Sequence, residues 1–333
     1  MTDRKFKPGD VVEIRPGDEI LSTLDQTGAL DGVPFMPEML QYSGRRFTVS
    51  KRVEKICDMV GPGGSRRMRD TVLLENLRCD GSAHGGCQAD CRIYWKEAWL
   101  TRVDAATGTK ADWAPAVTPA PPPVFVPLAQ ISRRTVRPAT EAADRDPAGD
   151  YYRCQATDAF IATESLRVRQ PGQYVREISS GNVSMGRFLR VGGRAVWGSL
   201  GRKLGFKSAI ALAPAGKNAV RGDSLDLKPG DWVQVKTPEE IARTLDETGR
   251  NRGLTFTFEM LPSCGKTFRV KDRVSRIVDE ETGKMLHFKN ECIVLEGSIC
   301  TGDYAPGRWF CPRDMYPYWR EAWLRRVDPM VES

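Results

Sequence analysis

The chain carries one stretch of sequence twice. Residues 7–53 align without a gap onto residues 228–274, and the match resumes near the end of each stretch. The repeated strings are Lys7 to Asp10 with Lys228 to Asp231, Glu38 to Leu40 with Glu259 to Leu261, and Trp95 to Leu100 with Trp319 to Leu324. Because there are only two copies and they lie far apart, the pattern predicts a duplicated domain instead of a short-period solenoid.

Each copy predicts a small β domain with one early helix. A Lys-Pro-Gly-Asp turn precedes an alternating stretch typical of a strand, Val11–Ile14 in the first copy and Trp232–Val235 in the second. In the second copy, the string Thr-Pro-Glu-Glu from residue 237 supplies an N-cap, a first-turn proline and a capping-box glutamate. We therefore expect a short helix that continues to Leu245, with Pro16 to Leu24 as its counterpart in the first copy.

Further strands and a tryptophan pair recur in both copies. The strands are expected at Arg46–Val49, Thr71–Leu74, Thr267–Val270 and Cys292–Leu295. The tryptophans expected to pack each domain are Trp95 with Trp99 and Trp319 with Trp323. The predicted fold class is mostly β with short helices (α+β), arranged as two tandem SH3-like β-barrel repeats joined by a proline-rich linker and a basic helical segment.

The chain divides into four predicted regions. Its 333 residues are enough for two domains and a connector. We predict a first SH3-like, Cys-rich repeat at 1–104, a proline-rich linker at 105–150, a basic, partly helical connector at 151–220 and a second SH3-like repeat at 221–333. The run Thr118 to Pro123 favours extended polyproline II structure without a packed core, so the linker is expected to act as a spacer.

The N-terminus has no pattern of a secretory signal. Met1 to Lys7 is basic but is not followed by an apolar stretch, and no apolar run in the chain is long enough to cross a bilayer. The expected location is the cytoplasm, with no transmembrane segment. Nine cysteines are unusual in such a reducing compartment, where metal binding, redox chemistry or burial explains them better than disulfides do.

The net charge of +7 is concentrated in the connector, where eleven basic residues stand against three acidic ones between Tyr151 and Val220. The candidate anion-binding or partner-binding surface consists of Arg187, Arg190, Arg194, Arg202, Lys203 and Lys207. The expected partner is another protein, and nucleic acid or an anionic membrane is the alternative through residues 151–220. One or two helices with solvated charges are the simpler interpretation.

The first copy concentrates its cysteines around a glycine-rich string, Arg78 to Cys91. The candidate metal ligands are Cys57, Cys79, Cys87 and Cys91, with His84 as a fifth. Four thiolates match a closed tetrahedral zinc site or a cubane iron–sulfur cluster. The spacing between Cys87 and Cys91 is longer than the usual zinc spacing, although on a helix the two sulfurs would share one face.

The second copy keeps only part of this cysteine set. The correspondences are Cys79 with Cys300, Cys87 with Cys311, Cys57 with Val278 and Cys91 with Met315. Either the first copy alone holds a metal, or the second copy rebuilds a site from Cys264, Cys300, Cys311 and another group such as His287. Inert buried thiols and a redox-active thiol pair are the other interpretations.

Catalytic motifs are scarce in this sequence. The chain has only two histidines, His84 and His287, and they do not align, which excludes a histidine triad shared by both copies. A thiolate–imidazole pair between Cys87 and His84 would be a nucleophile, but no surrounding motif supports one. These motifs do not distinguish an enzyme from a binding protein.

The glycine-rich string also marks a resemblance. Arg78 to Ala89 followed by Cys91, and then Trp95 to Leu100, is similar to a family of uncharacterised bacterial Cys-rich proteins with two repeats. The resemblance extends to Tyr152 to Thr157 and to Ser180 to Val183, and so covers most of the chain. It implies no activity, because the family has none assigned.

The leading hypothesis is a metal-binding tandem-repeat protein with a binding or assembly role. Its zinc would be structural, because four thiolates leave no open coordination position for water. The first alternative is an iron–sulfur redox protein that uses the same cysteines. The second is a nucleic-acid or membrane-surface adaptor that binds through the basic connector.

Overall fold

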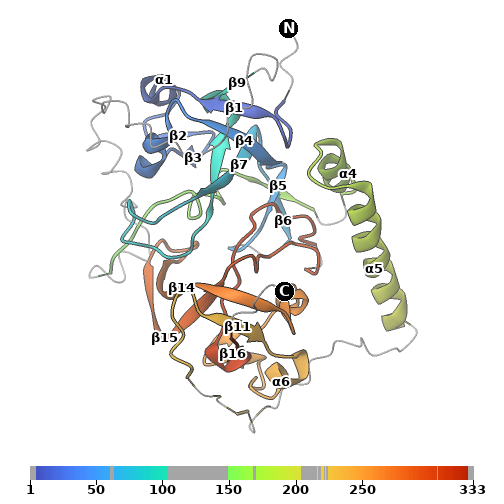
Figure 1. Cartoon of the computed structure of the whole chain (residues 1–333). Coiled ribbons are helices and arrows are strands. Elements are labelled where there is room, and N and C mark those ends of the chain that lie inside the picture. The colour runs from blue at the N-terminus through green and yellow to red at the C-terminus, as the bar shows by residue number, and fades with distance from the viewer. Residues whose placement is uncertain are drawn as a thin grey trace. The chain divides into compact units, whose positions relative to one another are not determined.

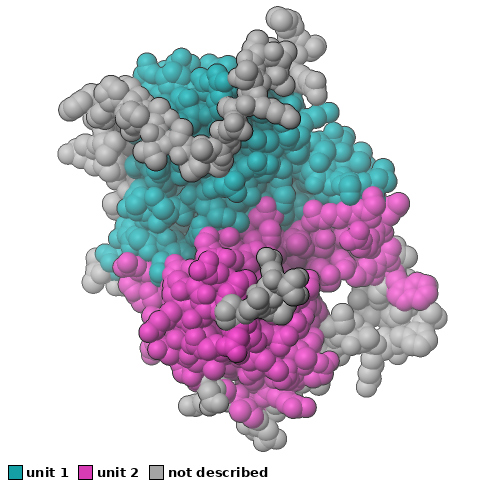
Figure 2. Space-filling view, viewed as in Figure 1, with its two compact units in different colours: residues 1–185, 278–286, 310–313 teal, residues 186–277, 287–309, 314–333 magenta. Residues whose placement is uncertain are grey.

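The computed structural model describes residues 5–60, 64–103, 149–167, 170–203, 216, 219–220, 222, 224–305 and 307–328. The fold is mostly β with short helices, and each half contains a curled antiparallel sheet shaped like half a barrel (Figure 1). The chain forms two compact units (Figure 2). Unit 1 comprises residues 1–185, 278–286 and 310–313, and unit 2 comprises residues 186–277, 287–309 and 314–333.

Unit 1 is built around a five-stranded sheet in the order β8-β7-β4-β1-β9. Its elements are β1 (Val11–Ile14), α1 (Gly17–Ser22), β2 (Ala29–Leu30), β3 (Val33–Pro34), η1 (Pro37–Tyr42), β4 (Arg46–Arg52), β5 (Lys55–Cys57), β6 (Ser65–Arg67), β7 (Thr71–Arg78), β8 (Arg92–Lys96), η2 (Glu97–Trp99), β9 (Leu100–Arg102), β10 (Glu164–Leu166) and α4 (Gly172–Ser179). The predicted strands of the first copy and its early helix are confirmed by β1, β4, β7 and α1.

The tryptophan pair of the first copy fills the core of this sheet. Trp95 and Trp99 are both fully buried, and the ring of Phe35 meets that of Trp99 edge to face at 5.3 Å. The Trp99 indole N–H donates to the Thr23 hydroxyl at 3.0 Å, which satisfies its only polar atom. This arrangement confirms the predicted packing role of the pair.

The segment 151–185, predicted as part of the connector, belongs to unit 1. Its β10 joins β6 and β5 in a three-stranded sheet. The side-chain amide of Gln155 accepts from the Tyr94 N–H at 2.7 Å and donates to the Tyr94 carbonyl at 2.9 Å. Asn182 forms the same pair of bonds with the main chain of Arg52, at 2.8 and 2.6 Å. Each side-chain amide makes the two main-chain hydrogen bonds that a neighbouring strand would make, which gives Gln155 and Asn182 a structural role.

Unit 2 repeats the plan of unit 1 with a four-stranded sheet in the order β15-β14-β11-β16. Its elements are α5 (Met185–Lys203, entering from the last residue of unit 1), β11 (Trp232–Val235), α6 (Pro238–Ala242), β12 (Arg250–Asn251), β13 (Leu254–Thr255), η4 (Phe258–Ser263), β14 (Thr267–Val278), β15 (Met285–Leu295), η5 (Glu321–Trp323) and β16 (Leu324–Arg326). The ends of β14 and β15 that form the hairpin tip belong to unit 1.

The local contacts of the second copy match those of the first. The predicted capping box of α6 is confirmed, with Thr237 and Glu240 each bonding the other's main-chain N–H. The Trp323 indole donates to Thr244 at 2.9 Å and meets the Phe256 ring at 5.4 Å. These are the counterparts of the Trp99 contacts, so the shared positions encode the fold.

The connector predicted at 151–220 as partly helical contains α4 and α5. Residues 105–148 of the predicted proline-rich linker lie outside the described part of the chain. Among the helices of the described ranges, none has the length and apolar character that a bilayer span requires.

Candidate functional site

Three potential metal ligands meet in unit 1 at the end of β7. Glu38 comes from η1, Cys79 directly follows β7, and His84 lies in the glycine-rich loop after it. The Cys79 Sγ lies 3.4 Å from His84 Nε2 and 3.5 Å from Glu38 Oε1, and one ligand atom from each residue lies within 4.8 Å of the others. A tetrahedron with the bond lengths of zinc to sulfur, nitrogen and oxygen has edges of roughly 3.3–3.6 Å. The two distances from Cys79 match these edges, and the third separation, between His84 Nδ1 and Glu38 Oε1, is longer at 4.0 Å.

The glycine-rich loop folds back because of its local sequence. Gly81 has a φ of +73°, and a Cβ at this position would lie 2.1 Å from the Cys87 carbonyl oxygen, so only glycine fits. Its own carbonyl accepts the N–H groups of His84 and Gly86 at 3.1 and 2.9 Å. Asp80 receives the Ser82 N–H and hydroxyl at 2.9 and 2.7 Å. The resulting compact turn returns the imidazole towards Cys79.

Burial leaves this group incompletely satisfied. Glu38 is 9% exposed and His84 is 2% exposed, and Glu38 Oε2 and His84 Nδ1 have no hydrogen-bond partner. Burial raises the pKa values of the Glu38 carboxyl and the Cys79 thiol and lowers the pKa of the His84 imidazole. All three changes favour the uncharged forms. A divalent cation would balance one thiolate and one carboxylate, which removes the electrostatic cost of burying either alone.

The second copy provides an internal comparison for this site. Glu259, the counterpart of Glu38, accepts main-chain N–H groups from Gly302, Tyr304 and Ala305 at 3.1, 2.6 and 2.7 Å. Its position in η4 is the same, but backbone donors satisfy its oxygens. The unpaired atoms of Glu38 and His84 are thus not a consequence of the fold that both copies share.

The four cysteines predicted as one metal site do not form one group. Cys79 belongs to the group with Glu38 and His84, whereas among the described residues no four-cysteine cluster of ligand spacing is present. Cys91 lies opposite Cys79 in the hairpin, since its carbonyl accepts the Cys79 N–H at 2.8 Å. The Cys87 Sγ instead accepts a main-chain N–H, and Cys57 contacts a cysteine of the second copy. The segment between Cys87 and Cys91 is not helical.

The set predicted for the second copy is divided between the two units. Cys311 belongs to unit 1, where its Sγ lies 3.2 Å from the main-chain nitrogen of Cys57. Cys264 and Cys300 belong to unit 2. Cys264 packs against the core of that unit, and the Cys300 N–H donates to the Met315 carbonyl at 2.8 Å.

The basic residues predicted as a binding surface are in part used within unit 2. Arg187 donates to the Asp303 carboxylate at 2.8 Å and to the Thr301 carbonyl at 2.9 Å. Arg194 donates to the Asp303 carbonyl at 2.8 Å and stacks 3.9 Å over the Tyr304 ring. The other residues of the predicted surface are located as follows. Arg190 is exposed on α5, Arg202 and Lys203 also belong to α5, and Lys207 lies outside the described residues.

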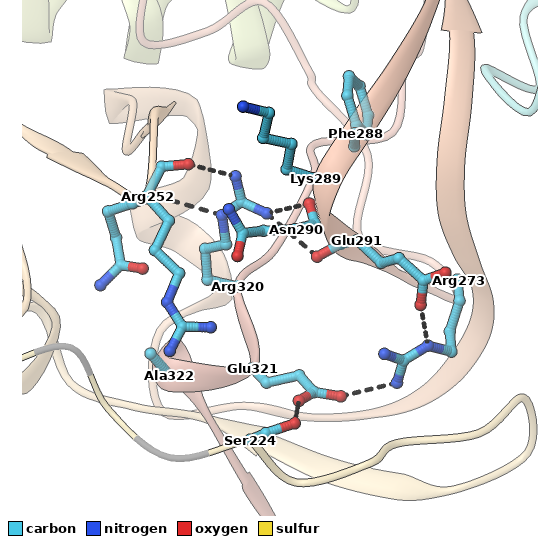
Figure 3. Close-up of a pocket in the computed structure, with 11 residues that line it drawn as sticks. Ser224, Arg252, Arg273, Phe288, Lys289, Asn290, Glu291, Arg320, Glu321 and Ala322 are labelled. Atoms are coloured by element: carbon cyan, nitrogen blue, oxygen red, sulfur yellow. Dashed lines mark hydrogen bonds and ion pairs between the residues drawn. The ribbon is translucent and has the colours of Figure 1, made fainter.

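A cavity of about 380 Å³ lies in unit 2 (Figure 3). Its lining includes Arg252, Arg273, Lys289 and Arg320, so its surface is polar and cationic. Arg320 donates to the carbonyls of Asn251, Asn290 and Arg252, at 3.1, 2.6 and 2.7 Å. Arg273 pairs with two glutamates that also line the cavity, at 2.8 and 2.7 Å. The two arginines therefore brace the walls, and the cavity offers less distinctive chemistry than the group in unit 1.

Sequence reasoning found Cys79 and His84 but missed Glu38. The only signal for Glu38 was its retention as Glu259, which indicates a fold role equally well. A scan against protein-family models gives no match, and searches of curated proteins and of solved structures give none either.

Proposed function

We propose that this chain is a metal-binding protein whose first copy holds one divalent ion, zinc foremost, through Glu38, Cys79 and His84. The observation that carries the proposal is the buried group itself, in which the Cys79 Sγ lies 3.4 Å from His84 Nε2 and 3.5 Å from Glu38 Oε1, at a position where the second copy satisfies its glutamate with backbone donors. Burying a carboxylate and a thiolate side by side is unfavourable unless their charges are balanced, and a divalent cation would balance them. Thiolate, imidazole and carboxylate are all established zinc ligands.

The proposed role of the ion is structural and serves binding or assembly. The three ligands come from η1 and from the loop after β7, so the metal would tie together segments that are far apart in the sequence. Cys91, which faces Cys79 across the hairpin, is the candidate for the fourth position. Four protein ligands would close the site to water. The iron–sulfur alternative lacks support from the described residues, because their cysteines do not gather as a cluster requires.

Three further features support the proposed fold, location and partner. Five antiparallel strands with a 3-10 turn before the last one support an SH3-like barrel for the first copy. Nine free cysteines suit a reducing, cytoplasmic location. Exposed Leu189 and Trp197 on α5 support a protein partner.

Metal titration of the full-length protein tests the proposal. After anaerobic purification and removal of metal by a chelator, we expect one equivalent of zinc to bind, and cobalt to give the intense visible and sulfur charge-transfer bands of a tetrahedral thiolate site. Cys79→Ser and His84→Ala should each weaken zinc binding by at least about a hundredfold, since even outer-shell changes cost 10- to 100-fold.

The matched control is Cys300→Ser, which alters the counterpart of Cys79 in the second copy. It should leave zinc stoichiometry and affinity unchanged, and circular dichroism should show that every variant is folded. Failure of the wild-type protein to bind any metal, or equal loss in Cys300→Ser, would reject the proposal. A brown protein with bound iron would reject zinc in favour of the cluster.

A further inference from the structure

Unit 1 contains two equivalent contacts in which a cysteine of one copy receives a backbone N–H of the other. The Cys87 Sγ accepts the Val278 N–H at 3.3 Å. The Cys311 Sγ accepts the Cys57 N–H at 3.2 Å. The duplication relates Cys87 to Cys311 and Cys57 to Val278, so each contact is the counterpart of the other. Retention of these two cysteines is thus explained by a main-chain hydrogen bond.

The two contacts differ in the residue that donates. In one the donor is Val278, whose side chain is inert, and in the other it is Cys57, which creates a pair of thiols. Arg313, which occupies the place of Ala89 in the first copy, lies beside this pair with its Nη1 4.0 Å from the Cys57 Sγ. Glu280 holds the Arg313 guanidinium through two contacts of 2.5 and 3.0 Å. Only the Cys57–Cys311 contact therefore combines two thiols with a fixed cation.

The two thiols also differ in accessibility. Cys57 is half-buried and lines a cavity of about 10 Å³ together with Arg66, Phe160 and Arg313. A cavity of this size is about the smallest that holds one water molecule. Cys311 is only 5% exposed. Cys57 is therefore the more accessible of the two thiols.

The two thiols also differ in pKa, and the more accessible thiol, Cys57, has the lower value. A hydrogen bond from the Cys311 thiol, together with the nearby Arg313 guanidinium, lowers the pKa of Cys57 to about 6 against the opposing effect of burial. The same hydrogen bond and burial raise the pKa of Cys311. A reactive cysteine requires an accessible thiolate near a positive charge and, for disulfide formation, a second thiol within reach.

We propose that Cys57 and Cys311 are a redox-active pair, oxidised to a disulfide by a small peroxide. The Cys57 thiolate attacks one oxygen of hydrogen peroxide, the O–O bond breaks, and the departing hydroxide takes up the proton released by that thiol. The Cys311 thiol then attacks the Cys57 sulfenic acid, and its proton leaves with the hydroxyl group as water. One peroxide is reduced to two waters, while two thiols become one disulfide. A dithiol reductant restores both thiols by exchange.

Peptide mapping of the intact, full-length protein tests this inference. The reduced protein is treated with an equimolar amount of hydrogen peroxide, the remaining thiols are alkylated, and the digest is analysed without reduction. We expect a cross-linked peptide containing Cys57 and Cys311 to form before any other, and to disappear on treatment with dithiothreitol. In Cys311→Ser, dimedone should instead trap a sulfenic acid on Cys57.

The duplication supplies the control variants. Cys57→Val introduces the residue found in the second copy and should abolish the cross-link, whereas Cys87→Ser should leave it unchanged. In the wild-type protein, iodoacetamide should also modify Cys57 at least about tenfold faster than Cys87 at neutral pH, a measurement that depends on no variant. A Cys57 that stays reduced, that links to another cysteine or that reacts no faster than Cys87 would overturn the inference. The metal site shares none of these residues, so the two proposals fail independently.

Discussion

Glu38 and Glu259 occupy the same position of the duplicated fold but have different surroundings. Three backbone N–H groups satisfy Glu259, whereas an imidazole and a thiol surround Glu38 and leave one of its oxygens unpaired. Retention of a residue in both copies therefore does not mean retention of its role. The second copy uses the carboxylate to shape a loop, and the first copy has it available as a ligand.

Residues at other equivalent positions make the same contacts in both copies. Arg52 pairs with Glu97 in the first copy, and Arg273 pairs with Glu321 at 2.7 Å in the second. The tryptophan–threonine bonds are also the same, at 3.0 and 2.9 Å. Symmetric contacts thus build the fold, and asymmetric contacts carry the candidate chemistry.

The largest expected effect concerns the contacts that are the same in both copies. Trp99→Ala and Trp323→Ala should each lower the free energy of unfolding by about 3–5 kcal/mol, because each removes a fully buried ring and leaves a cavity. Denaturant unfolding monitored by circular dichroism would measure both. A loss in only one of the two variants would show that the copies do not share a common core.

The next largest effect distinguishes the roles of Glu38 and Glu259. In metal-free protein, Glu259→Gln should cost about 2 kcal/mol, since it weakens charge-assisted bonds to backbone donors. Glu38→Gln should cost less than about 1 kcal/mol, because an amide replaces a carboxyl that few partners contact. Thermal melts after chelation would compare them. Equal losses would contradict the assigned difference in role.

The pH dependence of stability provides a smaller effect, which has opposite signs in unit 1 and unit 2. Burial, partly offset by Asn182 and Lys55, raises the pKa of Glu177 from 4.5 to about 7. The folded state therefore binds more protons than the unfolded state between these values, so stability falls as the pH rises from 4.5 to 7. Burial also lowers the pKa of Lys55 from 10.5 to about 8, so stability recovers between pH 8 and 10.5.

We expect the contribution of Glu177 to be on the order of 1–2 kcal/mol, because its attraction to Lys55 offsets part of the shift. Urea unfolding across this pH range should show a minimum near neutral pH, and Glu177→Gln should flatten the acidic side. In unit 2 the opposite sign holds: hydrogen bonds outweigh burial and lower the pKa of Glu321 to about 2, so this stabilisation is lost as the pH falls through 4.5 towards 2. A slope that survives Glu177→Gln would assign the pH dependence to another group.

The smallest effect concerns the matched cysteine contacts. Cys57→Val should change the free energy of unfolding by less than about 1 kcal/mol, because valine is of similar size and the backbone N–H bond to Cys311 remains. The measurement is the urea midpoint of the reduced protein. A larger loss would mean that the Cys57 thiol stabilises the fold and is not kept for its reactivity.

The duplicated fold was largely predictable because its signals are local. Alternating residues at 11–14 and 232–235 become β1 and β11, and the capping string at 237–240 begins α6. The candidate site was only half predictable. Cys79 and His84 lie five residues apart, but Glu38 approaches them through the curl of the sheet, which no local pattern reports. The contact of Cys57 with Cys311 spans most of the chain and was hidden for the same reason.

The assignment of residues 278–286 and 310–313 to unit 1 bears on how the protein is made. The partner of Cys87 is residue 278 and the partner of Cys57 is residue 311, so both are synthesised long after the cysteines that they contact. Until then the amino-terminal half carries unfilled hydrogen-bonding positions and depends on its own sheet for order. Each copy thus supplies unit 1 with a hydrogen-bonding partner for the other, so loss of either copy would leave one of these groups without that partner.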